Sequence, residues 1–327
     1  QMVYGEYVVG PQIKLAKRLS KLLPDNLQSF YFLNSGSEAV EGAMKLAKKH
    51  TGRGKIVAMR NAYHGSTSGA LSMMSDEYYS GPFKPLLPNI HFAELNELAT
   101  LDIIDEQTAA VFIEPIQSEK GYIPVTQIFL NALRIKCNET GTLLVFDEIQ
   151  SVIGRTGKLY AFEHYNVVPD ILLSAKALGG GMPIGVFISS KKIMDSLSDN
   201  PILGHITTFG GHPVSCAAGN AALKFLTKSS LMDEVAEKEA LFRELLVHPK
   251  IKGISGKGLM LAVQLDSFEE VERTMKRCIE RGVIIDWFLY NLECLRISPP
   301  LIITKKQIRE AVSYTTLTLP TKRRVYL

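Results

Sequence analysis

The stretch LLVFDEIQ, Leu143–Gln150, is an apolar run of strand length that ends in two acids and an amide. Its Leu, Val and Phe content, with little polar alternation, indicates a strand that is covered on both faces of a sheet. Ligands of open α/β sheets bind beyond the carboxyl ends of the strands, so Asp147 occupies a position that favours function. A loop acid that caps the next element is an equally good interpretation of Asp147 taken alone.

Comparable apolar runs occur on both sides of this stretch and alternate with helical patterns. The expected strands are Phe30–Leu33, Lys55–Met59, Ala109–Glu114, Thr142–Asp147, Ile171–Ser174 and Gly185–Ser189. Among the expected helices, Ser37–His50 places its apolar residues on one face. Gln127–Thr140 is followed by Gly141, a residue typical of helix C-termini. This alternation predicts an α/β fold.

The character of the sequence changes after Lys228. A helical pattern over Leu231–Val247 is followed by an expected strand over Met260–Leu265, a helix over Glu269–Arg281, and two further expected strands, Val283–Asp286 and Glu293–Ser298. We therefore expect a large domain over residues 1–228 and a small α+β domain over residues 229–312. Residues 313–327 have no helical period, which predicts a non-native tail; a genuine basic tail is the alternative. The chain begins with Gln1 rather than Met, and we expect it to lack its natural N-terminal segment.

The composition excludes several classes of protein. The chain has 327 residues, 46% hydrophobic and 21% charged, which suits a large core and excludes disorder as the main state. Apart from Lys322-Arg323-Arg324 the basic residues are scattered, so no nucleic-acid partner is indicated. No apolar run approaches the roughly 20 residues of a membrane span. Four cysteines without C-x-x-C spacing favour the cytoplasm, and the seven histidines include no metal-ligand pair at helical spacing, so we expect no metal.

Lys176 follows the strand Ile171–Ser174 and precedes the run Gly179–Gly181. Partial desolvation there would favour the neutral, nucleophilic amine, the form that makes Schiff bases. A snorkelling surface lysine is the ordinary alternative. The apolar strand and the glycines favour the functional interpretation.

Three further segments are weak signals when taken singly. Asn34–Ala39 follows a strand and opens a helix, a position that suits a bound phosphate, although Ser35 and Glu38 also form a capping box. Tyr63 and His64 lie in a turn after a strand and would more often pack than bind. Gly204–Pro213 is a loop rich in hydroxyls and glycine that precedes a helix.

Taken together and in this order, these segments resemble the class III aminotransferases, pyridoxal 5'-phosphate (PLP) enzymes of fold type I, and in particular their ornithine and acetylornithine branch. The resemblance covers roughly Tyr4 to Ala311. The matching motifs are NSGSEAVEGAMKLAK, YHGST, FIEPIQSEKGYIP, LLVFDEIQSVIGRTGK, PDILLSAKALGGGMPIG, TTFGGHPVSCAAGNAAL and LRISPPL. It implies a large domain with a mostly parallel sheet, a smaller C-terminal domain, and PLP as cofactor.

The resemblance also implies roles for individual residues. Lys176 would carry PLP covalently and move protons, and Asp147 would pair with the pyridine nitrogen and keep it protonated. Thr208 would reach the phosphate of the partner subunit, which implies a homodimer with shared active sites. The remaining cofactor-binding residues would be Ser35, Gly36 and Ser37 at the phosphate, Tyr63 on the ring face, Gln150 at the phenolic oxygen, and His64 and Glu148.

Substrate recognition is implied for two more residues. Arg296 would bind the α-carboxylate of 2-oxoglutarate or glutamate, and Glu119 would neutralise it when an ω-amine donor is bound. The chain departs from the branch at Ser66, where an arginine that grips the donor's distal carboxylate is usual. This departure makes a diamine donor, or an amino acid that is anchored elsewhere, a credible alternative to ornithine-type donors.

The sequence therefore predicts a PLP-dependent aminotransferase that moves an amino group from an ω-amine donor to a 2-oxo acid, with 2-oxoglutarate as the expected acceptor. Two alternatives stay open. One is a mutase or decarboxylase of the same fold that acts through Lys176. The other is an incomplete chain that binds PLP without turnover.

Overall fold

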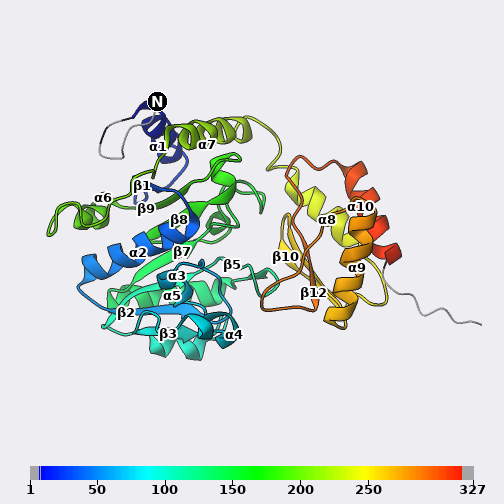
Figure 1. Ribbon diagram of the computed structural model, residues 1–327, viewed down its shortest axis with the longest axis horizontal. Coiled ribbons are helices and arrows are strands. Elements are labelled where there is room, and N and C mark those ends of the chain that lie inside the picture. The colour runs from blue at the N-terminus through cyan, green and yellow to red at the C-terminus, as the bar shows by residue number, and fades with distance from the viewer. Residues whose placement is uncertain (1–6, 8, 319–327) are drawn as a thin grey trace, which may run out of the picture. The chain divides into compact units, whose positions relative to one another are not determined.

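The computed structural model describes residue 7 and residues 9–318, which form two compact units (Figure 1). The large unit takes in the chain up to Pro115, together with Val125–Ile153 and Tyr160–Ser229. The small unit takes in Ile116–Pro124, Gly154–Leu159 and the chain from Ser230 onward. The segments Ile116–Pro124 and Gly154–Leu159 precede the expected boundary at residue 228, yet they belong to the small unit.

A seven-stranded sheet forms the centre of the large unit. Its order is β1 (Ser29–Leu33), β9 (Gly185–Ser189), β8 (Ile171–Ala175), β7 (Leu143–Asp147), β4 (Thr108–Ile113), β2 (Lys55–Met59) and β3 (Ile90–Ala93). Only β9 runs antiparallel to its neighbours, so the sheet is mostly parallel, as expected of fold type I. The edge strand β3 was not predicted, because its partly exposed residues give no continuous apolar run.

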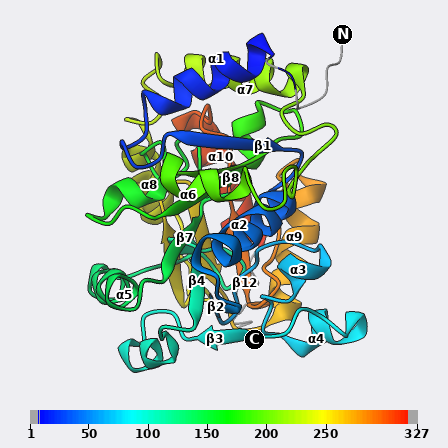
Figure 2. The same cartoon turned by 90° about the vertical axis from the view of Figure 1, so that its left-hand side faces the viewer.

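The long helices of the large unit are α1 (Gly10–Ser20), α2 (Gly36–Thr51), α5 (Gln127–Thr140) and α7 (Pro213–Leu226). Of these, α2 and α5 pack on the sheet and begin and end near the predicted signals. Ser35 caps α2 by accepting a hydrogen bond from the Glu38 amide, and Gly141 ends α5 in the left-handed conformation at φ 67°. α2 packs on β4, β8 and β9, and α1 lies beside α7 (Figure 2).

The remaining helical segments of the large unit are short. They are α3 (Ser68–Leu71), α4 (Glu77–Ser80), α6 (Lys191–Met194), and the 3-10 turns η1 (Gly81–Phe83), η2 (Leu98–Ile103), η3 (Ala161–His164), η4 (Lys176–Gly179) and η5 (Asp195–Leu197).

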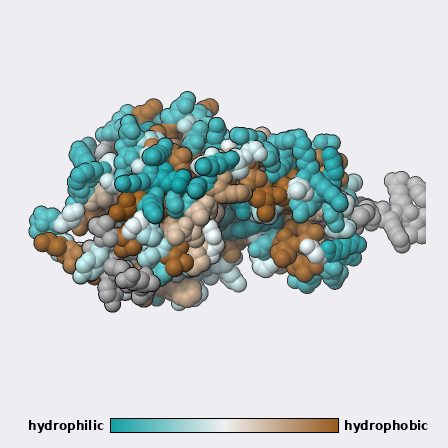
Figure 3. All heavy atoms as spheres, turned by 90° about the horizontal axis from the view of Figure 1, so that it is seen from above, coloured by the Kyte–Doolittle hydropathy of each residue, from teal (hydrophilic) through white to brown (hydrophobic). Residues whose placement is uncertain are grey.

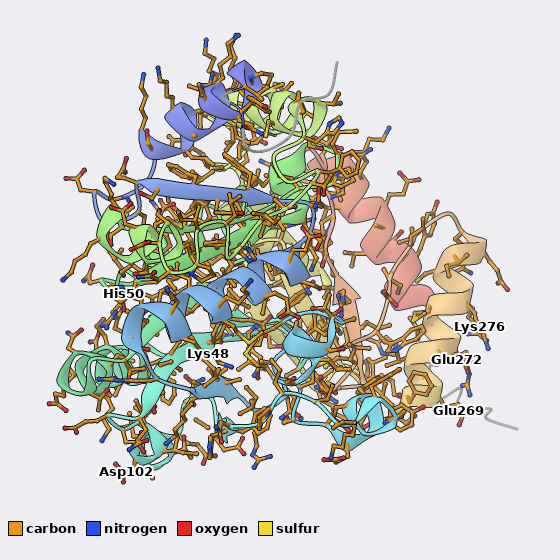
Figure 4. The ribbon with its side chains drawn as sticks, turned by 60° about the vertical axis from the view of Figure 1, so that its left-hand side comes forward. Lys48, His50, Asp102, Glu269, Glu272 and Lys276 are labelled. Carbon is orange, nitrogen blue, oxygen red and sulfur yellow. The ribbon has the colours of Figure 1, made fainter. Side chains whose placement is uncertain are left out.

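The small unit has an antiparallel sheet of β10 (Gly253–Lys257), β11 (Met260–Gln264) and β12 (Cys294–Ile297), and a two-stranded ribbon of β5 (Ile116–Gln117) and β6 (Ile123–Pro124). Its helices are α8 (Val235–Leu245), α9 (Phe268–Glu280) and α10 (Lys305–Thr318). The strand expected over Val283–Asp286 does not form: Ile284 is 90% exposed, and of this segment Asp286 makes an isolated bridge with Arg296. α9 buries Val271, Met275 and Cys278 and turns Glu269, Glu272 and Lys276 outward (Figure 4). This division of α9 into an apolar and a charged face is what a helix packed on one side of a core requires.

The final helix is longer than the sequence pattern suggested. α10 continues through Ser313 to Thr318, beyond the end expected near Val312. No Gly or Pro occurs within its residues, so nothing in the sequence interrupts the helix at Val312. The rest of the expected non-native tail, residues 319–327, lies outside the described residues. In the part of the chain that is described, no helix has both the length and the apolar character needed to cross a membrane.

Candidate active site

A cavity of about 280 Å³ lies in the large unit, where β7 and β8 end and α2 begins. The residues that line it come from six separate segments of the chain. They are Asn34, Ser35, Gly36, Ser37, Tyr63, His64, Gly65, Glu114, Asp147, Ile149, Gln150, Ala175, Lys176, Met182, Pro183 and Ile184. The structure thus brings Lys176, Asp147, Gln150 and the start of α2 to one place, although the sequence separates them widely.

The Asp147 carboxylate is buried at the end of β7 and has two hydrogen-bond partners. His64 Nδ1 lies 2.8 Å from Oδ2, and the Ile149 amide donates to Oδ1 at 3.0 Å. Burial alone would lower the pKa of His64, but the hydrogen bond and charge of Asp147 and the charge of Glu114 outweigh it, so this pKa is raised. A protonated His64 can donate through Nδ1 and thereby hold the Asp147 carboxylate in a fixed orientation.

Two close approaches shape the start of α2. A Cβ atom at Gly36 would meet Ile149 Cδ1 at 2.8 Å, so a larger residue here would displace the Ile149 side chain in the loop after β7. At Gly65, where φ is 131°, a Cβ would lie 2.2 Å from Ser37 Oγ. The first turn of α2 has amide groups without partners inside the helix, and these can bind an anion. Half of the predicted capping box is present, because Ser35 Oγ accepts the Glu38 amide, while the Glu38 carboxylate accepts the amide of Asn34, one residue before the N-cap, at 2.7 Å.

Lys176 follows β8 directly and has a strained backbone. Its φ is 44°, in the left-handed region that residues other than glycine rarely adopt. A lysine that lines the same cavity as a buried carboxylate and a helix N-terminus supplies the groups that PLP requires: an amine, a partner for the pyridine nitrogen and a phosphate cradle. The residues present therefore fit PLP.

Glu148 does not line this cavity. Its side chain is fully buried on the other side of the strand end and accepts hydrogen bonds from the amides of Ala161 at 2.5 Å and Phe162 at 2.7 Å, and from Ser151 Oγ at 2.8 Å. Burial raises the pKa of Glu148 to about 7 against the effect of these hydrogen bonds. Successive side chains of an extended strand point to opposite faces, so Glu148 anchors the chain that leaves β7 while Asp147 faces the cavity.

Thr208 is exposed and is not among the residues that line the cavity. Its loop also exposes large apolar side chains, with exposed fractions of 77% for Ile202, 61% for Leu203, 62% for Ile206 and 48% for Phe209. Figure 3 shows apolar atoms on the left of the view, where the segment that follows α6 lies. An exposed apolar group of this kind is typical of an interaction surface.

Glu119 and Arg296 form an ion pair within the small unit. Arg296 Nη2 lies 2.5 Å from Glu119 Oε2, and the same oxygen accepts the Leu289 amide at 3.2 Å. Arg296 is fixed on β12, where its amide donates to the Asp286 carbonyl at 2.7 Å. The two side chains predicted to act together are therefore paired.

The sequence analysis missed Glu114 as a residue of the cavity. Glu114 is buried, accepts the Tyr63 amide at 3.3 Å and contributes to the electrostatic environment of His64. Its position could have been found, because Glu114 ends an expected strand just as Asp147 does. Ser66, where the branch has arginine, pairs its hydroxyl with that of Tyr63 at 2.9 Å. At position 66 this chain therefore has two neutral hydroxyl groups where the branch has a positive charge.

With this geometry in view, the comparisons with known proteins identify the family. The family model for class-III aminotransferases matches residues 2–319, and the chain belongs to that family of PLP-dependent enzymes. A LysW-aminoadipate semialdehyde/glutamate semialdehyde transaminase from Sulfolobus acidocaldarius is 39% identical over 303 residues, which are 91% of this chain and 76% of that protein. A putrescine aminotransferase from Pectobacterium atrosepticum is 38% identical over 315 residues, 90% of this chain and 66% of that protein.

A solved structure shares the fold. The ornithine aminotransferase from Toxoplasma gondii, described with partial occupancy of PLP at its active site, superposes with a TM-score of 0.90 at 28% identity, over 97% of this chain and 77% of that one. The predicted family, fold type I, PLP cofactor and aminotransferase activity toward amine donors are thereby confirmed. The alternative of a mutase or decarboxylase is not favoured, since the two relatives above are named as a transaminase and an aminotransferase.

Proposed function

We propose that this aminotransferase passes the amino group of an ω-amine donor to 2-oxoglutarate and works in the amino-acid metabolism of the cytoplasm. The observation that carries the proposal is the cavity that unites Lys176, the Asp147–His64 pair and the first turn of α2. Four cysteines, all buried and unpaired, support a reducing compartment.

Each residue of the cavity has a distinct task in this proposal. Lys176 holds the cofactor and then moves a proton at its amine nitrogen. Asp147, oriented by His64, keeps the pyridine nitrogen protonated, and Gln150 donates to the phenolic oxygen. Tyr63 covers the ring face, and Ser35 to Ser37 at the start of α2 bind the phosphate. When bound, PLP supplies the electron-accepting ring.

The donor that best fits is an amine without a distal carboxylate, such as a diamine. The hydroxyl pair of Tyr63 and Ser66 offers hydrogen bonds but no positive charge at the position where the branch has arginine. The relative from Pectobacterium atrosepticum is named for putrescine, which is a diamine. The relative from Sulfolobus acidocaldarius is named as a semialdehyde transaminase, so a donor of the amino-acid type is the second candidate.

The acceptor's α-carboxylate is proposed to bind Arg296. Glu119 neutralises Arg296 in the structure through the contact of Oε2 with Nη2, an arrangement that a carboxylate ligand can replace. With Glu119 on Arg296 the enzyme would accept a donor that has no α-carboxylate. With Arg296 released it would bind the α-carboxylate of the acceptor.

We also propose a homodimer in which Thr208 of one subunit reaches the phosphate of the other. The exposed apolar side chains around Thr208 support an interface there. A ligand that binds only the assembled site stabilises the assembly by mass action, so PLP should slow dissociation on dilution. Thr208→Val should weaken this effect in sedimentation measurements. An equal response of both proteins to PLP would contradict the shared site.

A donor screen on the full chain tests the catalytic proposal. Diamines, ornithine and acetylornithine are each offered with 2-oxoglutarate, and formation of glutamate is measured. Turnover with a diamine and little turnover with acetylornithine is the expected result. Glutamate formation from none of the donors would overturn the proposal.

A further inference from the structure

We propose that Phe288 is a positioning residue for Arg296, and that its ring fixes the plane of the guanidinium while the carboxylate partner of Arg296 is exchanged. The inference rests on the proposed role of Arg296 in binding the acceptor's carboxylate. It concerns only residues of the small unit.

The aromatic contacts of Arg296 are well defined. Arg296 Cζ lies 4.5 Å from the centroid of the Phe288 ring and 5.8 Å from that of Tyr122. Phe288 is completely buried, and the Tyr122 ring meets it edge to face, with centroids 4.9 Å apart and planes at 88°. The two rings therefore support each other as well as the guanidinium.

Tyr122 is itself held firmly. Its hydroxyl lies 2.6 Å from Ser298 Oγ, two residues beyond Arg296 on the same chain segment. Its φ is 51°, a strained value that persists only where the surrounding packing enforces it. The orientation of the Phe288 ring is thus fixed by a second segment of the chain, the one that carries Tyr122.

The geometry separates two kinds of contact to Arg296. A ring binds the flat face of a guanidinium, whereas a carboxylate binds the N–H groups at its edge. Glu119 therefore competes with a substrate carboxylate for the edge, but Phe288 does not. Arg296 Nε is buried without a hydrogen-bond partner in the structure, so Glu119 leaves one donor of this edge unused.

The consequence concerns the exchange of partners. When Glu119 releases Arg296, the long side chain would gain freedom that binding of the next carboxylate must remove again. Stacking on Phe288 keeps the guanidinium ordered during that interval. Phe288 should then affect the affinity for the acceptor and leave the donor's reaction unchanged.

The test compares Phe288→Leu with a matched control, Trp287→Leu. Trp287 is the neighbouring aromatic residue; it is 40% exposed, and its ring contacts Phe268. In Phe288→Leu the KM for 2-oxoglutarate should rise roughly three- to thirtyfold, from the usual strength of cation–π contacts. Its kcat and the rate of the donor half-reaction with a diamine should stay within about threefold. Trp287→Leu should change none of these values.

Three further measurements keep the proposal open to refutation. Phe288→Tyr retains the ring and should restore the KM. Phe288→Met, of similar volume, replaces Phe288→Leu if thermal unfolding shows that the leucine variant does not fold, and the same KM shift is expected. Direct titration with glutarate, a dicarboxylate that needs no turnover, should show the same loss of affinity.

The outcomes distinguish this inference from the proposed function. An unchanged KM and glutarate affinity in folded Phe288→Leu, or an equal loss in both half-reactions, would overturn the role of Phe288. If the unaltered chain uses no 2-oxo acid, the proposed function fails instead, and the glutarate titration still tests the stacking.

Discussion

The cavity of the large unit and the ion pair of the small unit hold their functional groups in opposite ways. The Asp147 carboxylate is 4% exposed and is fixed by two hydrogen bonds at the end of a central strand. The Arg296 side chain is 19% exposed, and its carboxylate partner contacts it at Nη2. The first arrangement suits a cofactor whose environment must not change during the reaction. The second suits substrates that must be exchanged in each cycle.

This comparison predicts the largest loss when the cofactor's attachment is removed. Lys176→Ala should lower turnover by more than about 10⁴-fold, because both the covalent link and the proton carrier are lost. Some non-covalent PLP should remain, since the start of α2 is intact. Borohydride reduction and peptide mapping of the unaltered chain should place the pyridoxyl group on Lys176.

The matched control for this experiment is Lys191→Ala, an exposed lysine paired with Asp195 on the surface. It should be fully active. A pyridoxyl group found on another lysine would refute the assignment of Lys176.

A smaller loss is expected when the charge of Asp147 is removed while its shape is kept. Asp147→Asn should reduce turnover by about 10²- to 10⁴-fold, because the pyridine nitrogen loses the anion that keeps it protonated. The affinity for PLP should change much less, as measured by cofactor titration. Turnover like that of the unaltered chain would show that the carboxylate serves another purpose.

The small unit should respond selectively. Arg296→Lys should lower kcat/KM for the 2-oxo acid by about 10²-fold, because an ammonium cannot bind a carboxylate in the bidentate manner of a guanidinium. The donor half-reaction with a diamine should be nearly unaffected. Separate stopped-flow measurements of the two half-reactions check this split, and equal losses in both would remove the distinction drawn between the two regions.

The smallest effect is expected from the partner of Asp147. His64→Phe should lower turnover by about tenfold, because Asp147 keeps the Ile149 amide but loses a charged donor. His91→Phe, at an exposed position on the edge strand, is the control. A turnover in His64→Phe equal to that of the control would show that the histidine does not orient Asp147.

The same pair predicts a dependence of stability on pH. The pKa of His64 is raised in the folded protein, so the stabilisation it provides is complete below the unfolded-state pKa of about 6.5. It is lost as the pH rises through the higher folded-state pKa. Denaturant unfolding across this range should show a decline of the free energy of unfolding that is weaker in His64→Phe.

The sequence by itself determined the elements and the chemistry at their ends. Apolar runs and helix caps placed most of the strands of the large unit, and its helices α2 and α5, to within about two residues. They also placed Lys176 and Asp147 where strands end. Periodicity and caps are properties of neighbouring residues, so they can be recognised before the chain is folded.

The tertiary structure alone decided which side chains meet. His64 and Asp147 are 83 positions apart, and Glu119 and Arg296 are 177 apart, so no local pattern links them. It also turned Glu148 away from the cavity and set Phe288 beneath Arg296. Those contacts depend on strand order and on the face that each side chain occupies, which arise only when distant segments pack together.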